Sequence, residues 1–432
     1  MNMFMLVESA FAGAALGVCL FWRRAFAGVL VWLAILVVVP YWGGVAAGGL
    51  IVPMCVAFGA VVLLPTVLSV RAVWHVLDFL AIGFVASCVM ASVLGFATWY
   101  DTGVVAAQWG LGYTLGRFWG SDIDRGRLAT VLALFGAVVG AFACLEFLMD
   151  WHPFTQVFPG TAVFDSWSWI QYRGGEPRSE WTFGHSIALG NVLAMCIPFV
   201  FGSKLSLIKR ACCIIVMLGG ITVTFSRNAM IAALIGLVIG VLLLVHESPK
   251  VRARMVVWLA VLAVTVLPFG LSVWGRASEE VSLSTDDRLQ LFSLLGDIKF
   301  LGASGTLQIL SDGQPGYESA AYSDGAARTI DNTFIYLGLN LGWVPVAFSL
   351  LLVVSVALLQ VKKGLRSAAG VAIVAQLPTL ATVAMITQYG MFFWVVLGIA
   401  VSGYTQVEAP RVACGETAES DRRDPRRGLA AE

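Results

Sequence analysis

Residues 127–149 read RLATVLALFGAVVGAFACLEFLM, an apolar run with a single acidic side chain, Glu146. A helix needs about 20 consecutive apolar residues to cross the hydrocarbon core of a bilayer, so this stretch is long enough. Its apolar residues follow one another without the alternation of a membrane β-strand, which excludes a β-barrel. The stretch therefore predicts a transmembrane helix.

Similar runs recur along the whole chain, whose composition also favours lipid as the surrounding solvent. Of the 432 residues, 59% are hydrophobic and only 12% are charged, whereas a soluble domain carries about 25% charged residues. We expect an all-α, polytopic bundle of about 12–13 spans, forming one transmembrane domain over residues 1–404. The expected spans are residues 4–22, 25–41, 49–69, 73–97, 103–119, 127–149, 184–202, 210–225, 229–246, 254–274, 333–359, 368–387 and 390–404.

Basic residues gather in alternate connections of this map, as the positive-inside rule requires of cytoplasmic loops. They are Arg23–Arg24, Arg71, Arg117, Arg125, Arg127, Lys204, Lys209, Arg210, Lys250, Arg252, Arg254, Lys362, Lys363 and Arg366. Residues 405–432 fall on the same side, and their mixed charge predicts a disordered cytoplasmic tail. The other, extracytoplasmic face receives two long polar loops, residues 150–183 and 275–332.

Several arginines lie on the extracytoplasmic face, against the insertion bias, so we expect a function for them. They are Arg173, Arg178, Arg227, Arg276, Arg288 and Arg328. The alternative is that they are solvated loop charges, paired with Asp165, Glu176, Glu180 or Asp286.

The first candidate site is the junction at residues 173–191. Arg173 and Arg178 precede a helix expected to begin near Gly184–His185. Helix N-termini attract anions, and arginine adds bidentate contacts to phosphate. The alternative is a surface loop whose arginines only contact lipid headgroups.

The second candidate is the tight turn Ser226-Arg227-Asn228 between two apolar runs. Ser226 is a natural N-cap, and Arg227 in the first turn opposes the helix dipole unless an anion lies there. Arg227 is therefore either a phosphate ligand or a charge that anchors a short turn.

The third candidate is the exit of the long loop. Arg288 opens an amphipathic stretch too short to span, which is expected at the interface, and the loop ends with Asp331-Asn332-Thr333. Asp331 or Asn332 is either the N-cap of the next helix or, for Asp331, a general base at the membrane mouth.

Nothing in the sequence predicts a metal or an organic cofactor. The eight cysteines lie in apolar runs or in the tail, and the four histidines are scattered without metal-ligand spacing. Phosphate loops, nucleotide-binding motifs and redox pairs are absent from the sequence. We expect no cofactor and no nucleic-acid partner.

The three motifs together resemble the O-antigen ligase and O-antigen polymerase family of bacterial membrane glycosyltransferases. Residues 224–229, TFSRNA, are similar to the family's Ser-Arg turn, and the loop exit at 331–342 is similar to that of the family. Arg288 followed by LLGDI and a Gly-x-x-Gly turn is similar to its interfacial helix. Arg173 and Gly184, with ten residues between them, are similar to an Arg-x10-Gly pattern of the polymerase branch.

Two departures leave the branch open, with polymerase the leading reading. The loop exit reads Asp331-Asn332 where ligases usually have His-Asn, and neither Arg276 nor Arg288 has a glycine eleven residues on.

The resemblance implies a metal-independent, inverting glycosyltransferase with a GT-C-like fold in the bacterial inner membrane. Its expected partners are a polyprenyl-diphosphate-linked glycan donor, a glycan acceptor and membrane lipids. Asp331, Arg227 and Arg288 are the expected catalytic residues. The expected substrate-binding residues are Arg173, Arg178, His185, Arg276 and Asn332.

The main rival from another class is a transporter, such as a lipid-linked oligosaccharide flippase. Transporters tend to show internal repeats and ionisable residues at mid-membrane. Here Asp78, Arg117 and Glu146 are the few charges inside spans, and one half of the chain does not repeat the other. A non-catalytic scaffold would leave the external arginines unexplained.

Overall fold

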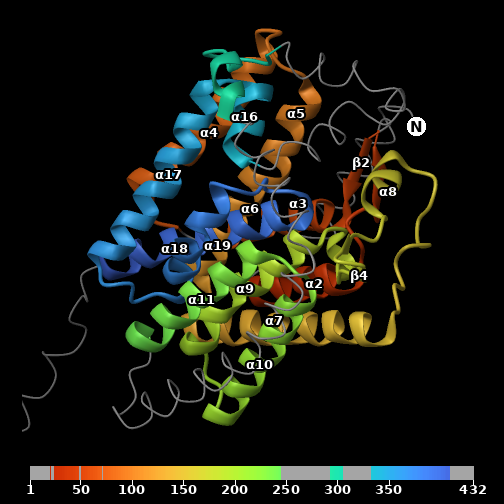
Figure 1. Ribbon diagram of the computed structural model, residues 1–432. Helices are drawn as coiled ribbons and strands as arrows, with labels where there is room; N and C mark the ends of the chain where they lie inside the picture. The colour runs from red at the N-terminus through yellow and green to blue at the C-terminus, as the bar shows by residue number, and fades with distance from the viewer. Residues whose placement is uncertain are drawn as a thin grey trace, which may run out of the picture.

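The computed structural model describes residues 24–47, 50–70, 72–244, 292–304 and 332–408, together with Leu20. Within these ranges the chain is mostly helical (Figure 1). The α-helices are α2 (Ala25–Val38), α3 (Met54–Ser69), α4 (Val76–Val93), α5 (Trp99–Val104), α6 (Leu111–Asp122), α7 (Arg125–Met149), α8 (Ala162–Trp167), α9 (Ser186–Gly202), α10 (Leu207–Val223), α11 (Arg227–Ile239), α16 (Thr333–Leu341), α17 (Trp343–Lys362), α18 (Ala368–Leu380) and α19 (Thr387–Glu408). The π-helical segments are Val105–Gly110 and Gly240–Leu244, and the 3₁₀ segments are Trp181–Phe183 and Phe292–Asp297.

Four helices of the described part are long and apolar enough to cross a membrane. They are Val76–Val93, Arg125–Met149, Arg227–Leu244 and Trp343–Lys362. Four shorter helices are also apolar: Ala25–Val38, Met54–Ser69, Ser186–Gly202 and Ala368–Leu380. The predicted helical class with apolar, membrane-type helices is confirmed to this extent. The expected spans at 4–22 and 254–274 lie outside the described residues.

The expected single span at 333–359 is divided in the structure. Gly342, with φ +93°, ends α16 and starts α17. A Cβ on Gly342 would lie 2.7 Å from Leu301 Cα, so only glycine fits this close approach. The amide of Trp343 donates to Lys299 O at 2.9 Å, which fixes the break to the preceding loop. Only α17 therefore has the length to span, and it runs alongside α4 (Figure 1).

Two short antiparallel hairpins, which the span map did not include, lie among the helices. The strands β1 (Gly44–Ala47) and β2 (Leu50–Pro53) pair antiparallel, and β2 occupies the start of the expected span at 49–69. A Cβ on Gly44 would lie 2.2 Å from Val52 O, so the strands need glycine there. The strands β3 (Tyr172–Arg173) and β4 (Glu176–Pro177) form a second hairpin.

Side-chain contacts bring the described basic connections to one end of the bundle. Lys204 Nζ lies 2.5 Å from Asp124 Oδ1, and Arg125 donates to Gly403 O at 3.3 Å. A Cβ on Gly202 would lie 3.3 Å from Ala368 Cβ, which places the 362–367 connection at the same end. We call the connections 72–75, 122–127, 203–210 and 362–367 the basic end.

The polar connections meet at the opposite end. The amide of Tyr41 donates to Thr182 O at 2.9 Å, and the indole of Trp42 donates to Val157 O at 2.8 Å. Gln388 Nε2 donates to Val39 O at 3.2 Å, which adds the start of α19. We call this the loop end. The described connections therefore separate as the alternation of spans predicts.

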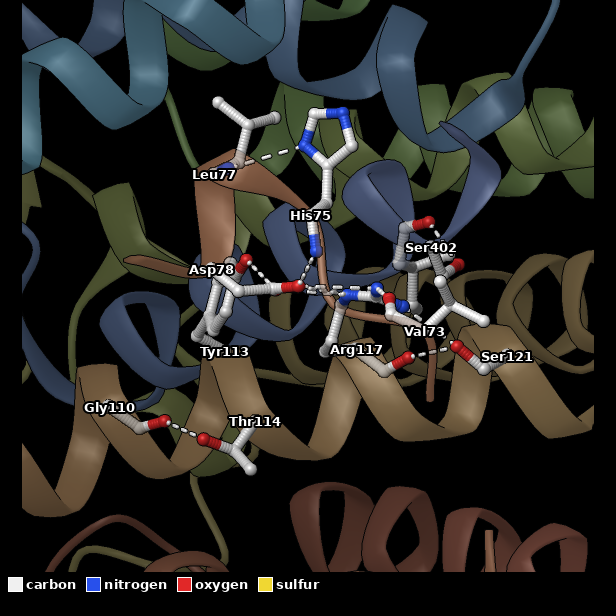
Figure 2. A network of polar contacts seen from close by, with 11 residues as sticks. Val73, His75, Leu77, Asp78, Gly110, Tyr113, Thr114, Arg117, Ser121 and Ser402 are labelled. Carbon is white, nitrogen blue, oxygen red and sulfur yellow. Dashed lines mark hydrogen bonds and ion pairs between the residues drawn. The ribbon is translucent and has the colours of Figure 1, made fainter. Parts of the chain in front are cut away.

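Two charges inside expected spans form a buried ion pair near the basic end (Figure 2). Arg117 Nε lies 3.0 Å from Asp78 Oδ1, and both side chains are almost fully buried. Tyr113 donates to Asp78 Oδ1 at 2.6 Å, and the amide of His75 donates to Asp78 Oδ2 at 2.8 Å. Arg117 also donates to Val73 O. These bonds satisfy the pair locally, as a buried charge requires.

Candidate functional site

A tight hairpin in the first polar loop positions Arg173 and Arg178. Gly174 and Gly175, at φ +57° and +83°, join β3 to β4. Positive φ at both central residues is the geometry of a two-residue type I′ hairpin, which glycine adopts without steric cost. The amide of Arg178 then donates to Gln171 O at 2.8 Å and extends the pairing. The sequence signal was the Gly-Gly pair, which we read only as part of a loop.

The hairpin binds to the turn between α10 and α11 through three consecutive carbonyl groups. The amide of Ser179 donates to Val223 O at 3.1 Å. Arg178 Nε donates to Thr224 O at 2.8 Å, and Arg173 Nη1 donates to Phe225 O at 2.8 Å. The structure thus unites the first two candidate sites, which are separate in the sequence.

The turn at residues 224–227 has a constrained backbone. Phe225 has φ +49° and is 1% exposed, with its ring edge-on to Phe147. A bulky residue at positive φ is an outlier that persists only where its surroundings fix it. Here the arginine bonds and the ring contact provide that constraint. Such strain is frequent at functional sites.

Arg227 is the first residue of α11 and lies beside this turn. Ser226 is the N-cap, and its Oγ accepts from the amide of Ala229 at 3.4 Å, so the predicted cap is confirmed. The first amides of a helix have no acceptor within it, which gives this end a partial positive charge. Arg227 is partly buried. Three arginines and a helix N-terminus therefore meet at residues 224–227.

A glycine of α9 permits the turn to pack closely. A Cβ on Gly190 would lie 2.8 Å from Ala229 Cβ and 2.9 Å from Thr224 Oγ1. The next residue, Asn191, is fully buried and its Oδ1 accepts from Thr379 of α18 at 3.3 Å. Helix α9 is therefore in contact with the arginine-bound turn on one side and with the end of α18 on the other.

His185 caps α9 at the loop end. Its Nδ1 accepts from the amide of Ile187 at 3.1 Å, and its ring lies edge-on to Trp167. With Nδ1 as acceptor, the ring proton of the neutral imidazole lies on Nε2. The helix begins at Ser186, so the predicted start near Gly184–His185 is confirmed. Gln171 Oε1 accepts from both Ser186 Oγ and Arg178 Nη1, which joins this cap to the hairpin.

Glu146 anchors the strand that carries Arg178, a role that sequence reasoning missed. Its Oε2 accepts from the amides of Glu180 at 3.0 Å and Trp181 at 2.8 Å. Its Oε1 lies 3.1 Å from His152 Nδ1. This hydrogen bond raises the pKa of His152 above its ordinary value. The available signal was an acid at the end of an apolar run with a histidine six residues on.

Asn332 is the N-cap at the exit of the long loop. Its Oδ1 accepts from the amides of Phe334 and Ile335 at 3.0 Å each, and its Nδ2 donates to Ala381 O at 2.8 Å. Of the two readings of this exit, the cap is confirmed and belongs to Asn332. Its side chain is buried in these contacts, and its contact with substrate stays a prediction.

The remaining site residues cannot be placed. Arg276, Arg288 and Asp331 lie outside the described residues. Of the amphipathic stretch after Arg288, the structure describes a 3₁₀ segment at Phe292–Asp297. Within the described ranges, no three or more His, Cys, Asp or Glu side chains group together as metal ligands would.

The chain has no match among models of known families, curated proteins or solved structures. Its function must therefore be argued from its own residues.

Proposed function

We propose that the chain is a polytopic glycosyltransferase of the bacterial inner membrane, of the O-antigen ligase and polymerase type. It transfers glycan units from polyprenyl diphosphate to an acceptor sugar on the extracytoplasmic face. The observation that carries the proposal is the convergence of Arg173 and Arg178 on the turn where Arg227 opens α11. These guanidinium groups and the helix N-terminus suit a diphosphate.

The arrangement also suits the electrostatics of glycosyl transfer. The oxygen of the acceptor hydroxyl attacks the anomeric carbon, and the bond from that carbon to the diphosphate oxygen breaks. The diphosphate leaves with the bonding electron pair, so negative charge grows on it. Fixed cations stabilise that charge, and each such contact contributes about 10²–10³ in rate. Arg173 and Arg227 are the proposed diphosphate ligands, with Arg288 from the later loop.

Arg178 positions this site. Its Nε donates to Thr224 O at 2.8 Å, and its Nη1 donates to Gln171 Oε1 at 3.1 Å. Its side chain is buried. It therefore fixes the hairpin against the turn and adds positive charge behind the substrate.

The acceptor hydroxyl loses its proton to a general base. Asp331 is the proposed base, and it directly precedes Asn332, the N-cap of α16. His185 is the second candidate. It can accept the proton at Nε2 only in the tautomer protonated on Nδ1, which gives up the hydrogen bond from the Ile187 amide, so Asp331 is placed first.

A transporter remains the alternative from another class. The charges within its expected spans weigh against it. Asp78 and Arg117 are bound to each other, and Glu146 binds two backbone amides and His152. A relay needs ionisable groups that exchange partners, whereas these three have fixed partners.

The test is the size distribution of cell-surface polysaccharide in a deletion strain complemented with wild type, Arg227→Ala or Lys209→Ala. Lys209 is an exposed cation at the basic end and serves as the control. Single repeat units that are extended by wild type and Lys209→Ala, but not by Arg227→Ala, support a polymerase. Long polymer left on its lipid carrier supports a ligase. An unchanged profile in the deletion strain contradicts the enzyme proposal and favours the transporter.

A further inference from the structure

A cavity of about 310 Å³ opens at the basic end, far from the arginine-bound turn in the fold. Its walls come from α6, α7, α9, α18 and α19 and from the end of the π-helical segment Gly240–Leu244. The apolar wall includes Leu128, Phe199, Leu244 and Ile399. The volume falls at the lower limit for small-molecule sites, which are apolar with a few polar groups.

Two arginines line the cavity beside this apolar wall. Arg125 is the first residue of α7, and Arg366 precedes Ser367, the N-cap of α18. Both side chains are exposed, so their guanidinium groups can reach a ligand headgroup. Arg125 Nη2 donates to Gly403 O at 3.3 Å, which holds it at the rim.

The surrounding charge is positive. The other lysines and arginines of the basic end are Arg127, Lys204, Lys209, Arg210, Lys362 and Lys363, and the acids on the adjacent connection are Asp122 and Asp124. Asp124 is paired with Lys204 at 2.5 Å. Arg117 lies three residues before the lining residue Gly120 in α6, but its charge is bound to Asp78. Among the described residues that line the cavity, Arg125 and Arg366 are thus the cations.

We propose that this cavity binds an anionic phospholipid, with its phosphate between Arg125 and Arg366 and an acyl chain on the apolar wall. An anionic phospholipid is chosen as the ligand because its charge complements the cavity. Arginine pairs with phosphate, and basic pockets between membrane helices bind anionic lipid headgroups. The basic end is also the end expected to face the anionic cytoplasmic leaflet. The bound lipid joins the helices that line the cavity and stabilises their packing.

Of the proposed function, this proposal depends only on the chain spanning a membrane, and it does not depend on glycosyl transfer. Its test is therefore a lipid-binding measurement rather than an activity. The full chain is purified in an uncharged detergent, and binding of phosphatidylglycerol is measured by native mass spectrometry and by the shift in melting temperature. Phosphatidylcholine and glycerol 3-phosphate are the comparison ligands.

Three variants test separately the charge of the two cavity arginines, the space inside the cavity and the overall positive charge of the basic end. Arg125→Ala/Arg366→Ala removes the two cations, and Arg127→Ala/Lys362→Ala removes two exposed cations of the same end outside the cavity. Gly403→Leu keeps both arginines and puts a side chain where a Cβ meets no atom within 4 Å. This glycine lies within a helix and lines the cavity, so the variant narrows the site and tests it independently of charge.

We expect wild type to prefer phosphatidylglycerol over phosphatidylcholine and to be stabilised by it. Loss of the two arginines weakens phosphatidylglycerol binding about 30-fold, and Gly403→Leu weakens binding of both lipids. The control pair changes affinity less than about threefold. Equal binding of the two lipids by wild type, an equal loss in the control pair, or equal stabilisation by glycerol 3-phosphate each overturns the proposal. Failure of glycosyl transfer alone leaves these readouts unaffected.

Discussion

Arg178 Nε donates to Thr224 O at 2.8 Å, across 46 positions of sequence. This bond joins the first polar loop to the turn that begins α11. Arg178 is 6% exposed and Thr224 is fully buried, so the contact lies in the interior rather than on a solvated surface. The first two groups of arginines in the sequence therefore belong to one structure.

We expect Arg178→Lys and Arg178→Ala to destabilise the protein by about 1.5–3 kcal/mol, the range for hydrogen bonds to charged groups. Lysine retains the charge but not the planar fork that reaches Thr224 O and Gln171 Oε1 together. Thermal unfolding in detergent measures the loss. The exposed Arg127→Ala is the control and should stay within about 0.5 kcal/mol. Wild-type stability in both Arg178 variants would mean that the hairpin is held by other contacts.

The Gly175→Ala substitution tests the hairpin backbone alone. Gly175 has φ +83°, and a Cβ there meets no atom within 4 Å, so alanine adds conformational strain without a clash. The expected cost is about 1–2 kcal/mol. Gly103→Ala is the matched control, because Gly103 lies in α5 and its Cβ also meets open space. In a helix the same change stabilises by about 0.5–1 kcal/mol. Unfolding measurements should give opposite signs, and equal signs would contradict the hairpin geometry.

The His152–Glu146 contact predicts a pH dependence of stability. The hydrogen bond to Glu146 raises the folded-state pKa of His152 above its ordinary value of 6.5. Protonation of His152 therefore stabilises the fold fully below about pH 6.5, and this contribution is lost as the pH rises through the higher folded-state pKa. Melting temperatures measured from pH 5.5 to 8.5 should fall with pH in wild type. His152→Gln should flatten the profile, and an unchanged slope in this variant would exclude His152 as its source.

Asp331 and Asn332 have different expected roles, although they are adjacent. Asn332→Ala removes the N-cap of α16 and should cost about 0.5–2 kcal/mol of stability. Asp331→Asn should leave the melting temperature unchanged and slow glycan extension by about 10²–10⁴. Both variants are compared for unfolding and for polymer length. Normal polymer from Asp331→Asn would remove it as the base.

The sequence predicted the helical class and the grouping of basic connections because both follow from local composition and alternation. It did not predict the break at Gly342, since a glycine inside an apolar run is equally compatible with a continuous helix. The close approach of Leu301 to Gly342 is a tertiary contact. The binding of Arg173 and Arg178 to residues 224 and 225 is likewise non-local. Local pattern indicated which arginines were unusual, but only the fold brings them together.

The same reasoning applies to Glu146. In the sequence it was one charge inside an expected span, compatible with a transporter. Its carboxylate accepts hydrogen bonds from the backbone amides of residues 180 and 181, more than thirty positions away. Its role as an anchor of the first polar loop depends both on its place near the end of α7 and on the distant residues 180 and 181 that it binds.

The most direct test of the central claim is the affinity of the purified full chain for a polyprenyl diphosphate, compared with its Arg173→Ala/Arg227→Ala variant. Lys209→Ala and Arg127→Ala are controls at the basic end, outside the cavity. We predict that the double variant binds at least about tenfold more weakly, because each arginine supplies a charge-assisted contact, while both controls bind as wild type does. Equal affinity in wild type and the double variant would contradict a diphosphate site at residues 224–227.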